Sequence, residues 1–146
     1  MKKALFPGSF NPFTIGHKDI ADRALRQVDR LIIAVGVNDQ KADDDNTQRR
    51  LQQIRDIYAD DARVEVMAFN EMTMDFARRH GCDIIIKGVR SVKDFEYERE
   101  QADINLAVGG IDTLIFFCRP ELASVSSSMV RTFQHFGKDT AMFLPK

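Results

Sequence analysis

The sequence has few cysteines, no long apolar run and almost no net charge. Its two cysteines, Cys82 and Cys118, lie far apart without metal-ligand spacing, which favours reduced thiols and a cytoplasmic protein. No stretch approaches the ~20 apolar residues of a membrane span, and Pro7 and Gly8 interrupt the first apolar stretch too early for a signal peptide. The 21 basic and 22 acidic residues leave a formal charge of −1, which disfavours a protein dedicated to nucleic acid or to a membrane surface.

The overall composition indicates an ordinary globular protein. With 146 residues, of which 44% are hydrophobic and 29% charged, the chain can bury a core without a disulfide or a metal. It contains no internal repeat, low-complexity tract or linker. We therefore expect one domain over residues 1–146.

Short apolar runs alternate with amphipathic segments along the chain. The expected strands are residues 4–6, 31–37, 64–68, 84–86 and 113–118, and the expected helices are residues 17–28, 47–58, 72–81, 92–108 and 129–137. This alternation predicts a Rossmann-like, doubly wound α/β fold: a five-stranded parallel sheet with helices on both faces. Ligands of such sheets bind beyond the carboxyl ends of the strands, so the loops 6–17, 37–46, 87–91 and 119–128 should share one rim.

The loop after the first expected strand ends in Gly16 and His17, where the first helix begins, and Thr14 is a candidate N-cap. A helix N-terminus favours phosphate, and an imidazole there adds a donor whose bond strengthens as charge builds on the phosphate. A glycine-dependent turn capped by a surface histidine would explain the same residues. The chain has neither a GxGxxG nor a GxxxxGK[ST] motif, which disfavours dinucleotide-hydride and P-loop enzymes.

A hydroxyl-rich segment, Ser126 to Ser128, precedes the last expected helix. One serine can cap this helix while the others bind phosphate oxygens, although three serines alone are equally typical of a redundant cap. Lys87 and Arg90 follow the fourth strand and flank Gly88, so they should project into the cleft, and Lys41 could reach the same region. Two positive helix starts with these cations suit a polyphosphate better than a single carboxylate.

Three segments carry a resemblance to a known family. Residues 8–17, GSFNPFTIGH, resemble the T/HxGH signature of the nucleotidylyltransferase superfamily, and residues 125–131, VSSSMVR, resemble its ISSTxxR element. Residues 87–98, KGVRSVKDFEYE, resemble the R-G-[LV]-R-x-x-x-D-[FY]-E-Y-E segment of the bacterial phosphopantetheine adenylyltransferases. The resemblance extends over nearly the whole chain.

The resemblance implies an enzyme that transfers AMP from ATP to 4′-phosphopantetheine. The products would be dephospho-coenzyme A and pyrophosphate, in the penultimate step of coenzyme A biosynthesis, by direct in-line attack without a covalent intermediate. His17 would stabilise the transition state at the α-phosphate, with Lys41 and Arg90 as further catalytic residues. The family also implies Mg²⁺ held mainly by ATP phosphates and water, and a homohexamer.

The resemblance assigns the remaining site residues by position. ATP would contact Ser9, Phe10, His17, Gly88, Val89, Arg90, Glu98, Leu122, Ala123, Ser124, Val125, Ser126, Ser127 and Ser128. Phosphopantetheine would contact Ser9, Lys41, Thr73 and Lys87. Neither cysteine lies in a predicted site.

Three departures from the family pattern keep alternatives open. Asn11 stands where the family more often has Asp, Lys87 replaces an Arg expected to hold the acceptor phosphate, and the loop 39–46 carries four aspartates. Because Asn at this position is frequent in nicotinamide and nicotinate mononucleotide adenylyltransferases, an enzyme of that kind is the first alternative. A non-catalytic nucleotide-binding sensor on the same scaffold is the second.

Overall fold

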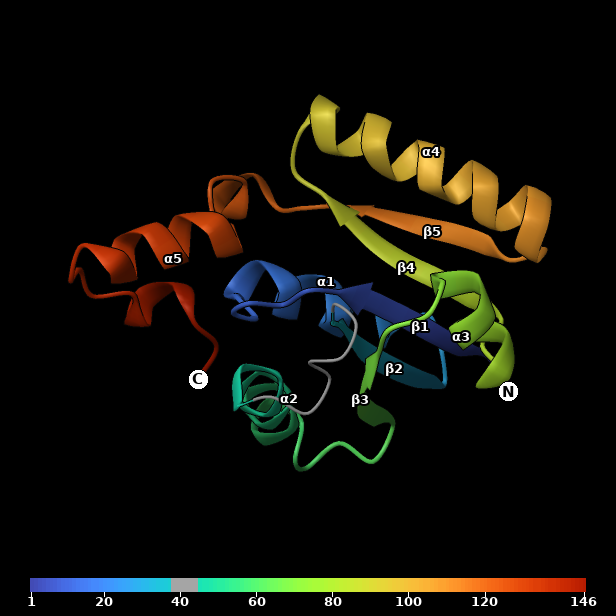
Figure 1. Cartoon of the computed structure of the whole chain (residues 1–146), viewed down its shortest axis with the longest axis horizontal. Helices are drawn as coiled ribbons and strands as arrows, with labels where there is room; N and C mark the ends of the chain where they lie inside the picture. The colour runs from blue at the N-terminus through green and yellow to red at the C-terminus, as the bar shows by residue number, and fades with distance from the viewer. Residues whose placement is uncertain (38–44) are drawn as a thin grey trace.

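The computed structural model describes residues 1–37 and 45–146. Five strands form one parallel sheet in the order β3-β2-β1-β4-β5: β1 (Lys3–Gly8), β2 (Arg30–Gly36), β3 (Val64–Phe69), β4 (Ile84–Val89) and β5 (Asp112–Phe117). The helices are α1 (Ile15–Ala24), α2 (Asp45–Ile57), α3 (Thr73–Arg79), α4 (Val92–Gly109) and α5 (Ser127–His135), with short 3-10 helices η2 (Pro120–Leu122) and η3 (Ala141–Phe143). The predicted Rossmann-like parallel sheet is confirmed (Figure 1).

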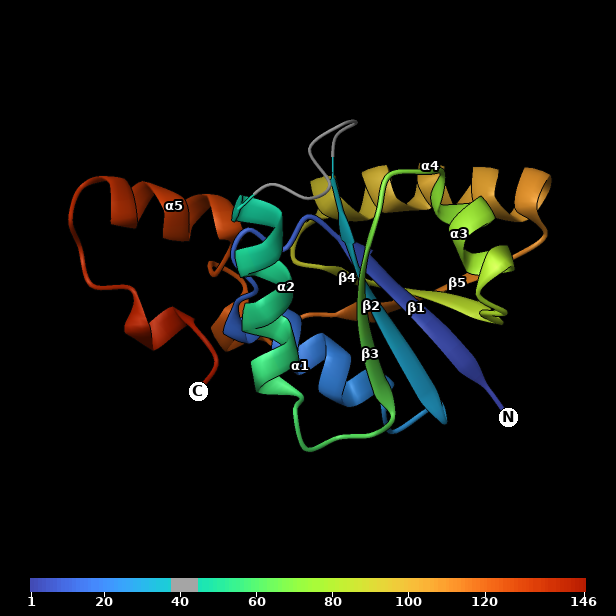
Figure 2. The same ribbon diagram turned by 60° about the horizontal axis from the view of Figure 1, so that its bottom comes forward.

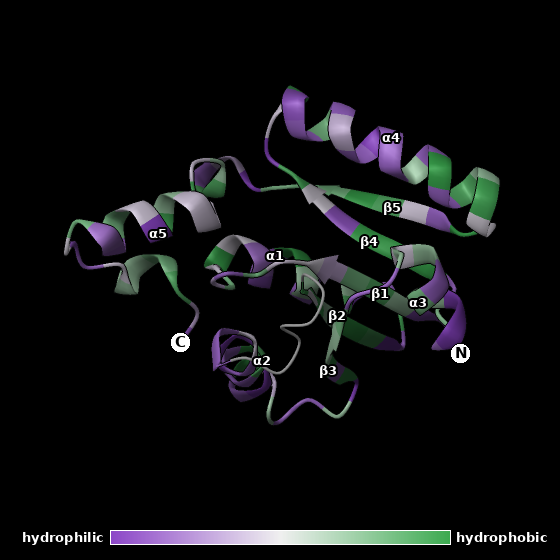
Figure 3. Ribbon diagram, viewed as in Figure 1, coloured by the Kyte–Doolittle hydropathy of each residue, from purple (hydrophilic) through white to green (hydrophobic). Residues whose placement is uncertain are grey.

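The helices cover both faces of the sheet (Figure 2). Successive strand residues point to opposite faces, so Phe6 and Ile33 pack in the core with α1 and α2, whereas Leu5 and Ile32 pack in the core with α3. Fully burying each such side chain contributes about 1.5–3 kcal/mol. Helix α2 is mostly hydrophilic in Figure 3 and buries only a narrow stripe, including Leu51.

The observed elements differ from the predicted ones mainly at their ends. Strand β4 continues to Val89 instead of ending at Ile86, because it pairs with β5 as far as Phe117. Lys87 and Gly88 therefore belong to the strand and not to the following loop. Helix α1 ends at Ala24 instead of residue 28, because tighter bonds between residues three apart close its last turn.

The sheet opens at the carboxyl end of β1. This strand pairs with β2 from Lys3 to Gly8 but with β4 only at Ala4 and Leu5. Pro7, which has no N–H to donate, follows the point where the β1–β4 ladder ends. The strand order also reverses between β1 and β4, which is where parallel sheets of this type bind ligands.

Helix α5 and the C-terminal segment extend beyond this end of the sheet (Figure 1). Val130 is fully buried on the inner side of α5. Phe133 packs edge-on against Phe143 of η3, with ring centroids 5.7 Å apart. None of the helices within residues 1–37 and 45–146 has the length and apolar character that crossing a membrane requires.

Candidate active site

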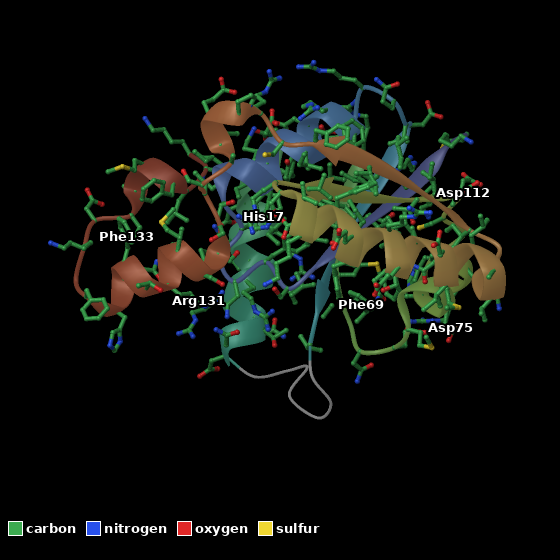
Figure 4. All side chains as sticks on the ribbon, turned by 90° about the horizontal axis from the view of Figure 1, so that it is seen from above. His17, Phe69, Asp75, Asp112, Arg131 and Phe133 are labelled. Atoms are coloured by element: carbon green, nitrogen blue, oxygen red, sulfur yellow. The ribbon has the colours of Figure 1, made fainter. Side chains whose placement is uncertain are left out.

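A cavity of about 340 Å³ lies where β1 and β4 separate. Its wall comes from the end of β1, the N-terminus of α1, the end of β4 and the segment leading into α5. In Figure 4, His17 and Arg131, which both line it, lie on the side of the molecule away from Asp112 at the start of β5. The residues predicted to bind ATP that line the cavity are Ser9, Phe10, His17, Gly88, Arg90, Glu98, Leu122, Val125, Ser126, Ser127 and Ser128.

His17 is held at the start of α1 by two reciprocal hydrogen bonds. The His17 N–H donates to Thr14 Oγ1 (3.4 Å), and the Thr14 N–H donates to His17 Nδ1 (2.9 Å), which confirms Thr14 as the N-cap. Because Nδ1 accepts a bond, the neutral ring carries its proton on Nε2. Burial, followed by the charges of Arg90 and Lys87, lowers the pKa of His17 to about 4. The imidazole is therefore a neutral donor near pH 7.

Two phenylalanines of the first loop support this ring. The centroid of the His17 ring lies 5.0 Å from that of Phe10 and 5.4 Å from that of Phe13. Phe10 has a φ of 46°, a left-handed conformation that is unfavourable for a non-glycine residue. The residue is only 2% exposed, so burial of its ring helps to offset this cost. A Cβ on Gly8 would lie 2.8 Å from the Phe10 ring, so the close approach of this ring requires glycine.

The start of α5 is hydrogen-bonded to the same loop. Ser126 Oγ caps α5 by accepting from the Met129 N–H (3.1 Å). Ser127 Oγ donates to the carbonyl of Pro12 (2.7 Å), and Arg131 Nη1 donates to the carbonyl of Asn11 (2.6 Å). The N-termini of α1 and α5 are thereby brought to one cavity, as the shared-rim prediction required.

The predicted cations at the end of β4, Lys87 within the strand and Arg90 directly after it, reach the cavity but have protein partners. Lys87 Nζ lies 3.0 Å from Glu98 Oε2, in an ion pair whose side chains are 24% and 14% exposed. Arg90 is more exposed, with its Nε 3.5 Å from Asp94 Oδ2. Among the residues that the structure describes, positive charge and a single, paired carboxylate thus face the same space, an arrangement suited to a polyanion.

A second cavity, of about 120 Å³, adjoins the first and shares Pro7, Lys87 and Glu98 with it. Thr73, predicted to contact the acceptor, lines this second cavity together with Asn105. Lys87 therefore lies at the junction of the two spaces. Lys41 lies outside the described residues.

The structure does not bring every predicted residue to the larger cavity. Val89, Ala123 and Ser124 are absent from its wall; Val89 is 3% exposed at the end of β4, where its carbonyl accepts from the Cys118 N–H (2.9 Å). Cys118, which was expected to lie outside any site, lines this cavity, because its bond to Val89 places it beside the end of β4. Arg131 also lines the cavity, and its signal was the final Arg of the serine-rich motif.

Comparison with known proteins assigns the family. Residues 5–133 match the family model described as cytidylyltransferase-like. The phosphopantetheine adenylyltransferases of Phocaeicola vulgatus and Bacteroides thetaiotaomicron are 46% and 44% identical to this chain over 146 residues, which is 100% of this chain and 97% of each relative. The chain belongs to the phosphopantetheine adenylyltransferase family. Porphyromonas gingivalis has a further member, 43% identical over 100% of this chain.

Solved structures of low sequence identity share the fold of this chain. A bifunctional NMN adenylyltransferase/ADP ribose pyrophosphatase from Francisella tularensis superposes with a TM-score of 0.71 at 15% identity. It is matched over 99% of this chain but only 45% of its own length. NadR protein in complex with NR gives a TM-score of 0.58 at 18% identity, over 99% of this chain and 43% of that structure. At such identities the likeness concerns the fold alone.

Proposed function

We propose that this protein transfers the adenylyl group of ATP to 4′-phosphopantetheine, giving dephospho-coenzyme A and pyrophosphate in the penultimate step of coenzyme A biosynthesis. The observation that carries the proposal is its likeness to phosphopantetheine adenylyltransferases over the full chain. The cavity supports it, because a neutral histidine donor, two helix N-termini and the cations Lys87, Arg90 and Arg131 face one space of about 340 Å³.

The reaction needs no strong general base. The acceptor is a phosphate monoester, which is already an anion, so one of its oxygens attacks the α-phosphorus directly while the bond to the pyrophosphate oxygen breaks in line. Negative charge grows on the α-phosphoryl oxygens during this exchange. The Nε2–H of His17, the starts of α1 and α5, and Arg90 act by positioning and by electrostatic stabilisation of that charge.

Each of the two adjoining cavities holds a different substrate in this proposal. ATP occupies the larger cavity, and the pantetheine arm of the acceptor enters the smaller one, where Thr73 lies. Lys87 stands at the junction, so its ammonium can pass from Glu98 to the acceptor phosphate as that phosphate approaches the ATP. Ser9 lines the larger cavity and is shared by the two substrates in this arrangement.

Magnesium accompanies ATP in this proposal. Within residues 1–37 and 45–146, the larger cavity offers one carboxylate, Glu98, which is already paired with Lys87, and no group of three or more potential metal ligands occurs. This donor set fits an ion that would be carried by the triphosphate and by water. The ion would offset part of the charge on the triphosphate.

A homohexamer is also part of the proposal. Helix α4 has no buried residue, and β5 is an edge strand of the sheet. Val92, Phe117 and Val108 on these elements are each about 70% exposed. Burying this apolar surface between subunits would stabilise an assembly of about 100 kDa from a 16.7 kDa chain, measurable by light scattering during size exclusion.

A cytoplasmic location completes the proposal. Cys82 and Cys118 are both free, which suits a reducing compartment. Fractionation of cells that carry a tagged chain tests this directly.

Pyrophosphate release with different acceptors tests the proposed reaction. The protein is incubated with ATP and Mg²⁺ and with 4′-phosphopantetheine, nicotinate mononucleotide or nicotinamide mononucleotide in turn. We expect pyrophosphate and a mass corresponding to dephospho-coenzyme A with the first acceptor. Release with a mononucleotide alone would assign the other adenylyltransferase activity, whereas ATP binding without release with any acceptor would indicate a sensor.

A further inference from the structure

We propose that Gln53 of α2 is a positioning residue: its side-chain amide holds the backbone of the first loop so that His17 faces the α-phosphate. This inference rests on the proposed adenylyl transfer. Gln53 does not line either cavity, so any effect on the reaction must pass through the residues that it holds.

The amide of Gln53 is bonded to both backbone groups of one residue. Gln53 Oε1 accepts from the Phe13 N–H (3.2 Å), and Gln53 Nε2 donates to the Phe13 carbonyl (2.9 Å). Such a pair restrains the position and rotation of the backbone much as a neighbouring strand would. Phe13 is 0% exposed, so its carbonyl and N–H have little access to water if the amide is removed.

Phe13 is linked to the imidazole in two ways. It directly precedes Thr14, whose N–H bonds to His17 Nδ1 and so keeps the ring proton on Nε2. Its ring also packs on the His17 ring at a centroid distance of 5.4 Å. A shift of the Phe13 backbone would therefore move the partner of Nδ1 and the surface on which the imidazole rests.

The same helix also holds the beginning of the loop. Arg50, one turn before Gln53, donates from Nη1 to the carbonyls of Ser9 (2.7 Å) and Gly36 (3.3 Å). Helix α2 thus binds the loop backbone near both of its ends, and it is itself anchored by its buried apolar stripe. Arg50 and Gln53, three residues apart on one side of α2, therefore both bond to the backbone of the first loop, which forms part of the cavity wall.

A comparison of two adjacent glutamines tests the proposal. Gln53→Leu removes the amide at similar size, and Gln52→Leu is the matched control, because Gln52 lies on the same helix, is exposed and bonds only to Asp56 among the described residues. For Gln53→Leu we expect kcat to fall by about 10- to 100-fold while the KM for ATP stays within about threefold, since misplacement affects the transition state more than binding. The control should keep both constants within about twofold of the parent.

Backbone hydrogen exchange gives a readout independent of turnover. Amides of residues 9–17 should exchange faster in Gln53→Leu than in the parent or in Gln52→Leu, because the Phe13 N–H loses its acceptor. If Gln53→Leu does not fold, Gln53→Glu serves instead. It keeps the acceptor for the Phe13 N–H but places a carboxylate against the Phe13 carbonyl, so the same fall in kcat is expected without the loss of that acceptor.

Several outcomes overturn the proposal. These are an unchanged kcat in a folded variant, a rise in the KM for ATP without a fall in kcat, or unaltered exchange in residues 9–17. If the parent protein releases no pyrophosphate with any acceptor, the proposed function fails. The exchange measurement then still decides whether Gln53 holds the loop.

Discussion

Replacing His17 by glutamine should separate its two roles. Glutamine is a typical third residue of a capping box, so its side chain can still accept from the Thr14 N–H, as Nδ1 does now at 2.9 Å. It does not place an N–H where Nε2 lies in the cavity. His17→Ala loses both the acceptor for the Thr14 N–H and the packing on Phe10, so the two variants differ in stability but share the missing donor.

The expected magnitudes follow from these contacts. Removing one preorganised donor costs on the order of 10²–10³ in kcat, or about 2.7–4 kcal/mol, and both variants should show this loss. The KM for ATP should change far less, because the charge that His17 stabilises grows only in the transition state. His17→Ala should also lose about 1–2 kcal/mol of unfolding free energy, while His17→Gln keeps most of it.

Steady-state pyrophosphate release and denaturant unfolding measure the two effects. The reasoning would be refuted if folded His17→Gln kept a kcat within about threefold of the parent. It would also be refuted if only His17→Ala lost activity, since capping and not donation would then be the role of His17.

The same variant tests the pKa of the imidazole. Its ordinary pKa of 6.5 falls to about 4 in the folded protein, so between these values the unfolded chain binds a proton that the folded chain does not. The stability that His17 contributes is therefore fully present above pH 6.5 and is lost as the pH falls to about 4, by roughly 3 kcal/mol in all. The unfolding free energy of the parent should decline relative to that of His17→Gln over this window, and a constant difference would contradict a half-buried ring held in its neutral form.

Three further predictions concern the walls of the cavity. Gly88→Ala should lower the unfolding free energy by about 1–3 kcal/mol, because its Cβ would lie 2.8 Å from Ile20 Cγ1. In thermal unfolding, adding Ile20→Ala should relieve part of this loss. If the effects of the two substitutions were simply additive, the result would argue against a clash. Arg131→Met should raise the KM for ATP about tenfold, because a cation that lines the cavity is lost. It should also lower Tm, because the charge-assisted bond to the Asn11 carbonyl is lost. An unchanged KM in steady-state assays would count against this role. Cys118 should react with iodoacetamide before Cys82, whose pKa is raised by burial, and ATP should slow the reaction of Cys118. Peptide mass spectrometry measures the labelling of each cysteine. If ATP did not change the labelling rate of Cys118, this residue would lie outside the ATP site.

The local sequence pattern was sufficient to predict structural features that depend only on residues close together along the chain. Thr14 was predictable as a cap because an N-cap bonds within three residues, and the buried strand at Ile84 was predictable from its apolar neighbours alone. The end of β4 was not, because its last three residues are strand only through pairing with β5. The position of Cys118 in the cavity wall was not predictable for the same reason, because it follows from a bond to Val89 on another strand.

What the sequence by itself determined is the succession of strands and helices along the chain, the described loops that line the cavity, and the family to which the chain belongs. These follow from periodicity and from motifs whose residues lie close together along the chain. Only the tertiary structure decided that Lys87 is paired with Glu98, that α5 is bonded to the first loop through Ser127, and that Gln53 holds Phe13 from 40 residues away. Contacts of this kind join residues distant along the chain, and they exist only once the sheet has brought their elements together.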